Sequence, residues 1–335
     1  MWYGVYPPQL IFLKKKFRKV LLNPPSLEPG SWCGAGKLLI DTETGEFWLT
    51  SRPRMGPIKR GFCFEIYRSN NGEDYSLVFS MSKEELSEIV GSVVHSIEGT
   101  QLLRDPSTGR YMLYLSVDVT NGNIAGGEGG VYESKWQTYL MTADDPAGPW
   151  KGEGFTIKCD MDYDSGEARD TTIDVIDGMY FALYKTRKAG ETKVNTALAL
   201  SRDGFNWVKL GILKVDGYDQ PGYFLLNGSI IAGCLGPIFI GTETLHVIKA
   251  AALTKHVSSY VIDYRRVNLE RIFRLEWKVG SIYEHQDFPI HTYMSIAYDL
   301  KSNRWLITVE AVDPESSREL GLNTEVDRLL LYMST

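Results

Sequence analysis

A repeated strand–turn–strand pattern constrains this chain of 335 residues more than any other feature. Five segments share an apolar strand, a turn rich in Asp, Asn or Gly, and a second strand with aromatic residues. They are residues 37–51, 100–116, 171–185, 223–236 and 293–310. Their starts lie about 50 to 70 residues apart. Short strands bounded by turn residues predict an all-β chain.

The segments between these hairpins also resemble one another: FEIYRSNNGEDYSLV, YLMTADDPAGPWKGE, LALSRDGFNWVKLG and FRLEWKVGSIY. Each repeat then holds four strands and cannot bury its faces alone, which is typical of β-propeller blades. Five hairpins predict a five-bladed β-propeller in a single domain over residues 1–335. We expect the terminal segments 9–17 and 327–334 to pair and close the ring. A β-sandwich is the alternative, but it does not explain the long period.

Two segments are predicted to be helical. Residues 82–94 (SKEELSEIVGSVV) begin with Ser82, a capping residue, and Glu85 follows three positions later. Residues 250–257 are expected to form a second, short helical turn.

Composition excludes several classes of protein. The net charge is -6, and the only basic run is Lys14–Lys19, so no nucleic-acid partner is expected. No apolar run is long enough for a membrane helix, and the N-terminus lacks the pattern of a signal peptide. The four cysteines are far apart, which predicts neither a zinc site nor a disulfide framework. These features predict a cytoplasmic protein; they leave its oligomeric state undetermined.

Acids recur at equivalent places before the first strand of successive repeats. In a propeller this strand lines the central channel, so residues at its start surround one mouth of the funnel. Glu98, Asp170 and Asp219 occupy this place in three successive repeats. The alternative is that these acids cap turns or pair with arginines. Other residues near the same places are Trp32, His95, Arg169 and His291.

A ring of acids around an aromatic funnel suits the cleavage of glycosidic bonds. That reaction needs a proton donor for the leaving oxygen and a second carboxylate, with different pKa values. The chain resembles the five-bladed propeller glycosidase superfamily, which includes glycoside hydrolase families 43 and 32 and the family 130 phosphorylases. The segments that carry the likeness are SIEGTQLLRDPSTGRYMLYLS, ARDTTIDVIDGMYFALY, TADDPAGPW and RGFCFEIYRSNNGEDYSLV.

The resemblance implies Glu98 as the general acid and Asp170 as a base or a carboxylate that tunes pKa values. It implies no cofactor, although some members hold calcium in the channel near a fifth-blade histidine. The chain departs from the pattern in the first blade, where the essential Asp is replaced by the residues 34–36, Gly-Ala-Gly. Asp41 is nearby, but we interpret it as a turn residue. Asp219 is then the candidate base.

Cationic and histidine side chains supply further candidates for substrate binding. Arg52, Arg54, Lys59 and Arg60 follow the first hairpin and are suited to a phosphate or a sugar acid. A solvated loop is the equally simple interpretation of this cluster. His285 belongs to a loop before the fifth hairpin that is expected to overhang the funnel.

Three functions follow from these patterns. The first is a glycoside hydrolase that binds a carbohydrate in the funnel and uses Glu98 with Asp170 or Asp219; the resemblance implies inversion. The second is a glycoside phosphorylase, in which Arg52 and Arg60 hold phosphate. The third is a carbohydrate-binding propeller without activity, which the missing first-blade acid favours.

Overall fold

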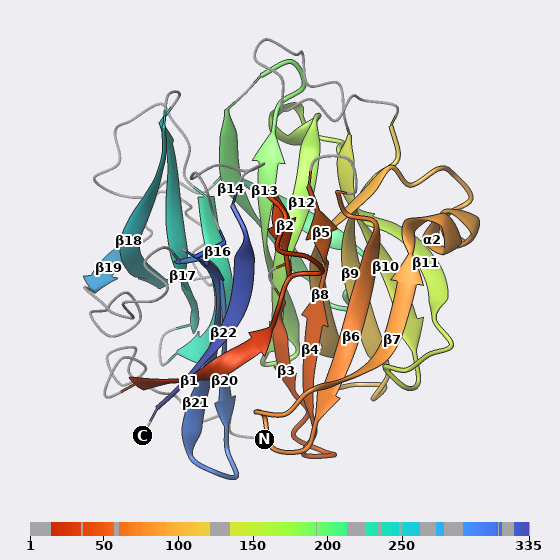
Figure 1. Cartoon of the computed structure of the whole chain (residues 1–335). Coiled ribbons are helices and arrows are strands. Elements are labelled where there is room, and N and C mark those ends of the chain that lie inside the picture. The colour runs from red at the N-terminus through yellow and green to blue at the C-terminus, as the bar shows by residue number, and fades with distance from the viewer. Residues whose placement is uncertain are drawn as a thin grey trace.

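The structure of the protein is a computed structural model, and most of the chain is described. The described residues are 15–34, 36–56, 60–120, 135–191, 193–212, 225–233, 236–247, 250–261, 273–277, 291–313, 315–316 and 325–334. Between residues 225 and 292 only the backbone is described. Strands dominate these residues, which confirms the predicted all-β class (Figure 1).

Most strands form four-stranded antiparallel units. The first unit contains β3 (Leu38–Ile40), β4 (Phe47–Ser51), β6 (Cys63–Ser69) and β7 (Ser76–Ser82). The second contains β8 (Ser96–Arg104), β9 (Tyr111–Asp118), β10 (Trp136–Ala143) and β11 (Lys151–Ile157). The third contains β12 (Glu167–Ile176), β13 (Met179–Arg187), β14 (Val194–Ser201) and β15 (Trp207–Ile212). One parallel pair, Trp136 with Glu167, joins the second and third units into one sheet.

The remaining strands continue the pattern. The fourth unit contains β16 (Leu225–Gly233), β17 (Gly236–Val247), β18 (Ala250–Val261) and β19 (Phe273–Trp277). The fifth contains β20 (His291–Asp299), β21 (Arg304–Val312) and β22 (Asp327–Ser334). The N-terminal strand β1 (Lys15–Leu22) pairs with β22, so the two ends of the described chain share one sheet. Two short strands, β2 (Ser31–Trp32) and β5 (Arg54–Met55), extend this sheet.

The first strands of the units lie next to one another. β3 contacts β8, β8 contacts β12, β12 contacts β16, β16 contacts β20, and β20 contacts β3. Figure 1 shows these strands running together through the middle of the molecule, whereas β7, β11 and β19 lie on its outside. The start of each first strand therefore lies near the starts of its neighbours.

Apolar cores fill the spaces between neighbouring units. One buried cluster joins Trp48 and Phe64 of the first unit to Leu113 of the second. A second cluster lies between the second and third units, and a third joins the first unit to the fifth. At these three junctions the units bury apolar faces against their neighbours, as the repeat predicted.

The hairpin turns repeat the same local chemistry. Asp41 accepts hydrogen bonds from the backbone N–H groups of Glu43 and Thr44, and Asp105 accepts one from Ser107. Gly45 and Gly109, four residues after each Asp, have φ of 76° and 74°, a conformation that favours glycine. Asp41 is therefore a turn residue, as expected from the sequence.

The predicted helix is present as α2 (Lys83–Val90), and it packs on β7 and β11. Ser82 caps it, and the side chains of Ser82 and Glu85 form a complete capping box.

Two expectations about the fourth repeat are wrong. Residues 250–257 are not a helical turn; they belong to strand β18, which pairs with β17 and β19. Pairing of Ala250, Ala251 and Ala252 with β17 outweighs the helical preference of the alanines. The hairpin expected within 223–236 also lies further along the chain. Asn227 and Gly228, which indicated its turn, pair with Thr242 and Gly241 in the middle of the ladder.

One of the hydrogen bonds between the first two units can be tested directly. The Tyr111 hydroxyl donates to the buried Asp41 carboxylate at 2.6 Å. Burial raises the pKa of Asp41, but this bond, the turn N–H groups and Arg104 together lower it. We expect Tyr111→Phe to reduce the free energy of unfolding by about 2 kcal/mol, because a bond to an ionised group is lost. Urea denaturation followed by tryptophan fluorescence measures this.

The matched control is Tyr139→Phe. Tyr139 is as buried as Tyr111, but its hydroxyl donates to the Ile89 carbonyl at 3.4 Å, a long bond to a neutral acceptor. The Tyr139→Phe substitution should reduce the free energy of unfolding by less than half as much as Tyr111→Phe. An equal reduction of the free energy of unfolding in the two variants would contradict the larger stabilisation assigned to the contact with Asp41.

Candidate functional site

Irregularities at the starts of three first strands shape the candidate site. In β8 the pairing skips Gly99, in β12 it skips Asp170 and Thr171, and in β20 it skips Thr292 and Tyr293. A β-bulge leaves residues unpaired and changes the direction of side chains beside it. The same distortion recurs in the second, third and fifth units, where their first strands converge.

Two of the three predicted acids lie together. A Cβ on Gly99 would stand 2.8 Å from the Asp170 Cα and 2.9 Å from its Oδ1, so Asp170 lies directly against the residue that follows Glu98. The backbone N–H of Asp170 donates to the Ser116 hydroxyl at 2.7 Å. Asp170 has a φ of 51°, an uncommon conformation for a residue other than glycine, which suggests a functional constraint.

Glu98 is held by two guanidinium groups. Arg60 Nε donates to its Oε1 at 2.7 Å, and Arg169 Nη1 donates to its Oε2. Glu98 is 6% exposed and Arg169 is equally buried. Two charge-assisted contacts in a buried place favour the ionised carboxylate over the acid.

Glu167 extends this set of buried ion pairs. It pairs with Arg169 at 3.0 Å, with Arg187 at 2.9 Å and with Lys185 at 3.5 Å. Arg169 also lies over the Trp136 ring, 4.4 Å from its centroid. These contacts fix the guanidinium between Glu98 and Glu167.

Asp170 lies in the field of several cations. Burial raises the pKa of Asp170. The charges of Arg169, Lys185, Arg52 and Arg60 lower it by more, so the pKa lies below its usual value. Asp170 is therefore ionised at neutral pH. Lys37 lies nearby: burial lowers its pKa to about 8, opposed by the charge of Asp170. Lys37 Nζ donates to Thr172 Oγ1 at 3.1 Å.

The first unit presents backbone instead of an acid at this place. Gly34 has a φ of 77°, and a Cβ there would clash with the Arg52 carbonyl oxygen. A Cβ on Gly36 would clash with the Thr50 carbonyl. A longer side chain, an Asp included, does not fit at either position with this backbone.

A carboxyl group from the fifth unit lies at the same place. Glu310 of β21, opposite the irregularity in β20, accepts the Gly34 N–H at 3.0 Å. Burial raises the pKa of Glu310 to about 7, and Arg52 and the Gly34 N–H oppose the rise. Asp327 is close to Glu310, and burial together with Glu310 and Glu325 raises its pKa well above the usual value. The first-unit position thus faces acids whose pKa values are raised by burial.

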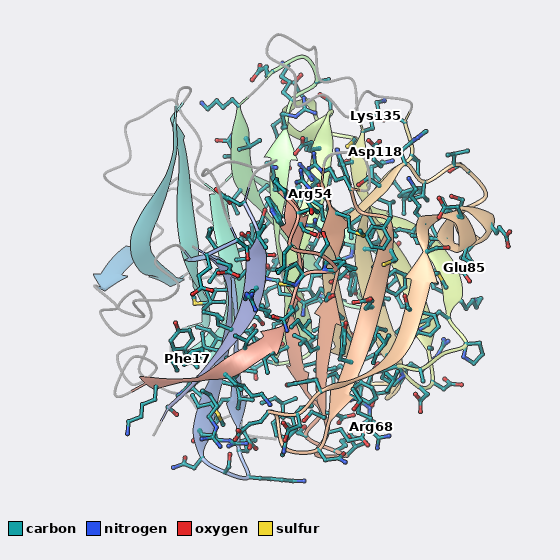
Figure 2. The ribbon with its side chains drawn as sticks, in the orientation of Figure 1. Phe17, Arg54, Arg68, Glu85, Asp118 and Lys135 are labelled. Atoms are coloured by element: carbon teal, nitrogen blue, oxygen red, sulfur yellow. The ribbon has the colours of Figure 1, made fainter. Side chains whose placement is uncertain are left out.

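Other sequence candidates lie around this centre. Arg54 stacks on Trp32 at 4.6 Å, and Figure 2 shows Arg54 and Asp118 towards the same end of the strands. His95 is half-buried; its backbone N–H donates to the Asp118 carbonyl, and its ring interacts with the Asp118 charge. The backbone of His291 pairs with Ala311 at the start of β20. Asp219, His285 and Lys59 lie outside the described residues.

Sequence reasoning missed Lys37, Lys185, Tyr293 and Glu310. A usable signal exists for two of them: Lys185 and Glu310 are charged residues that directly follow a largely apolar run in the second strand of their hairpins. Tyr293 has its pKa raised to about 12 by burial and by Asp170, which places its hydroxyl among the charged groups.

No group of three or more His, Cys, Asp or Glu side chains in the described part of the chain is arranged to hold a metal ion. Among its helices, none has the length and apolar character needed to cross a membrane.

Comparison with known proteins identifies the fold. No protein-family model matches the sequence, and no curated protein matches it. Solved structures do match. An α-L-arabinofuranosidase from Lactobacillus brevis is 12% identical, with a TM-score of 0.61 over 92% of each chain. A family 43 β-xylosidase/α-arabinofuranosidase from a compost metagenome, solved with xylotriose in a calcium-free form, is 11% identical, with a TM-score of 0.60 over 94% of each chain.

A family 117 glycoside hydrolase from Zobellia galactanivorans also matches, with 10% identity and a TM-score of 0.54 over 96% of this chain and 90% of that one. The predicted resemblance to the propeller glycosidases is thus confirmed at the level of the fold. At these identities the likeness concerns the fold and not the chemistry.

The charge state of Glu310 gives a prediction for stability. A carboxyl whose pKa rises on folding contributes stability that is complete below its unfolded pKa, about 4.5, and is lost as the pH rises towards 7. Glu310→Gln keeps an acceptor for Gly34 and removes the titration. We expect the free energy of unfolding of the variant, minus that of the wild type, to increase by roughly 3 kcal/mol between pH 4.5 and pH 8.

Urea denaturation at several pH values measures this difference, with Glu88→Gln on the exposed face of α2 as the control. A constant difference between Glu310→Gln and the wild type across this range would contradict the assignment.

Proposed function

We propose that this chain is a glycoside hydrolase whose carbohydrate substrate binds where the first strands converge. The four four-stranded units and the fifth unit, which β1 completes by pairing with β22, are the blades of a closed five-bladed propeller, formed by the whole chain as one domain. Support for closure comes from the cyclic contacts of β3, β8, β12, β16 and β20 and from the pairing of β1 with β22.

The observation that carries the proposal is the close approach of Asp170 to Gly99, the residue after Glu98, in a fold shared with glycoside hydrolases. Glycoside hydrolysis uses two carboxyl groups on either side of the bond that breaks. Asp170 is ionised and shares no side-chain hydrogen bond with the described residues, so it is suited to act on a water or on the sugar. Glu98 is the second carboxyl group of the pair.

Glu98 can act as the acid only if it holds a proton when the substrate is bound. Its two guanidinium partners oppose this, so one of them must move away. Arg60 is the candidate, because its side chain is 27% exposed whereas that of Arg169 is 7% exposed. Substrate that draws Arg60 away from Glu98 would raise the proton affinity of the carboxylate. Asp219 remains a predicted base.

Two substitutions test the pair. We expect Glu98→Gln and Asp170→Asn each to lower kcat/KM at least about 100-fold, because each removes a group needed for proton transfer or charge stabilisation. The measurement uses a panel of aryl-glycosides and oligosaccharides, and circular dichroism verifies that the variants fold. Asp144→Asn is the control, because the Asp144 side chain is 93% exposed and lies outside the centre.

Full activity in either variant would contradict that residue's role. The same panel separates the two alternatives. Turnover that requires inorganic phosphate would indicate a phosphorylase, for which Arg52 and Arg60 among the central cations are the supporting observation. Sugar affinity without cleavage of any glycoside would indicate a binding propeller, which the glycine backbone in place of a first-unit acid favours.

A further inference from the structure

Arg52 is a buried cation without a direct partner in the described structure. The residue follows β4 and is 6% exposed. Within the described residues its guanidinium makes no hydrogen bond and no ion pair of contact distance. It interacts electrostatically with Asp170 of the third unit and with Glu310 and Tyr293 of the fifth. A buried guanidinium carries five donors, and such groups are normally satisfied.

Two more polar groups come to the same place. Tyr293 carries a hydroxyl and Asp170 a carboxylate, and neither side chain has a hydrogen bond to another described residue. Both interact electrostatically with Arg52. The three groups belong to the first, third and fifth units, so no single unit places them. Glu98 and Glu167 differ, because arginines engage them directly.

The described centre contains many charged groups, and cations and acids are equal in number. Seven cations are linked through ion pairs or electrostatic interactions: Lys37, Arg52, Arg54, Arg60, Arg169, Lys185 and Arg187. Seven acids belong to the same network: Glu98, Asp118, Glu167, Asp170, Glu310, Glu325 and Asp327.

Three of these acids have a pKa raised mainly by burial: Asp118, Glu310 and Asp327. Burial, followed by repulsion from Arg60 and Arg52, lowers the pKa of Arg54 to about 10. An additional negative charge in this place would be stabilised by the surrounding cations.

We infer that the sugar bound at Arg52 is acidic, a hexuronic acid residue whose carboxylate accepts hydrogen bonds from the Arg52 guanidinium and the Tyr293 hydroxyl. This inference rests on the proposed function and names its substrate class. A planar carboxylate matches the fork of an arginine and binds it through two parallel bonds. A neutral sugar hydroxyl would leave the buried Arg52 guanidinium without a hydrogen-bonded counter-charge. Asp170, which only accepts hydrogen bonds when ionised, is then left to face the hydroxyls of the sugar.

Equilibrium binding to the full-length chain tests this inference. Isothermal titration calorimetry compares the methyl glycosides of glucuronic, galacturonic and mannuronic acid with those of glucose, galactose and mannose. We expect at least one acidic sugar to bind at least about tenfold more tightly than its neutral counterpart, from the charge-assisted bonds to Arg52. Equal affinity within all three pairs would overturn the inference.

Two variants test whether Arg52 causes the preference for acidic sugars. Arg52→Gln should reduce it to about twofold or less, whereas Arg68→Gln should leave it unchanged. Arg68 is an exposed arginine paired with Glu46, and Figure 2 shows it at the opposite end of the strands from Arg54. A preference that survives in a folded Arg52→Gln protein would overturn the assignment to Arg52. If that variant does not fold, the comparison of sugars in the wild type still decides.

Inorganic phosphate is the other source of an oxyanion and is titrated in parallel. Binding of phosphate without any preference for acidic sugars would overturn the inference, since the oxyanion would then be a co-substrate. Failure of the proposed function gives a different result. Hydrolysis of neutral glycosides alone would support the proposed function and contradict the acidic substrate. A preference for acidic sugars without hydrolysis of their aryl glycosides would support the acidic ligand and contradict the proposed hydrolysis.

Discussion

A chain of buried ion pairs runs from Arg60 through Glu98 and Arg169 to Glu167 and connects the first three units at the centre of the molecule. Removing a charge from water is costly unless a partner and hydrogen bonds replace the solvent. Arg169 meets this condition by contacting two carboxylates and the face of Trp136. Because these contacts join the second and third units, the start of β8 is fixed relative to the start of β12.

This arrangement decides which central groups remain for a ligand. Glu98 and Glu167 engage most of the nearby cations directly, whereas Arg52 and Asp170 interact with the network only through its field. The distorted starts of β8, β12 and β20 place the latter groups where the units converge. The site therefore combines paired charges, which are held in place, with Arg52 and Asp170, which can donate and accept hydrogen bonds to a ligand.

The sequence predicted part of the site and missed part of it for clear physical reasons. Glu98, Arg169 and Asp170 were found because they occupy equivalent places in successive repeats, and periodicity along the chain is visible without coordinates. Glu310 was not found, because it comes from the second strand of its hairpin and reaches Gly34 across a junction between units. The fourth repeat shows the opposite failure, since its Asn-Gly pair indicates a turn but lies within a ladder.

The sequence by itself determined the all-β class, the repeated four-stranded unit and its turn chemistry, including the capped helix after Ser82. These depend on neighbouring residues, whose spacing the chain fixes directly. Only the tertiary structure decided that Glu98 is held by two arginines, that Gly34 faces a carboxyl with a raised pKa, and that the buried Arg52 interacts electrostatically with Asp170. Those outcomes depend on distances and burial between units, and neither is encoded in any local pattern, because ionisation responds to the whole three-dimensional environment.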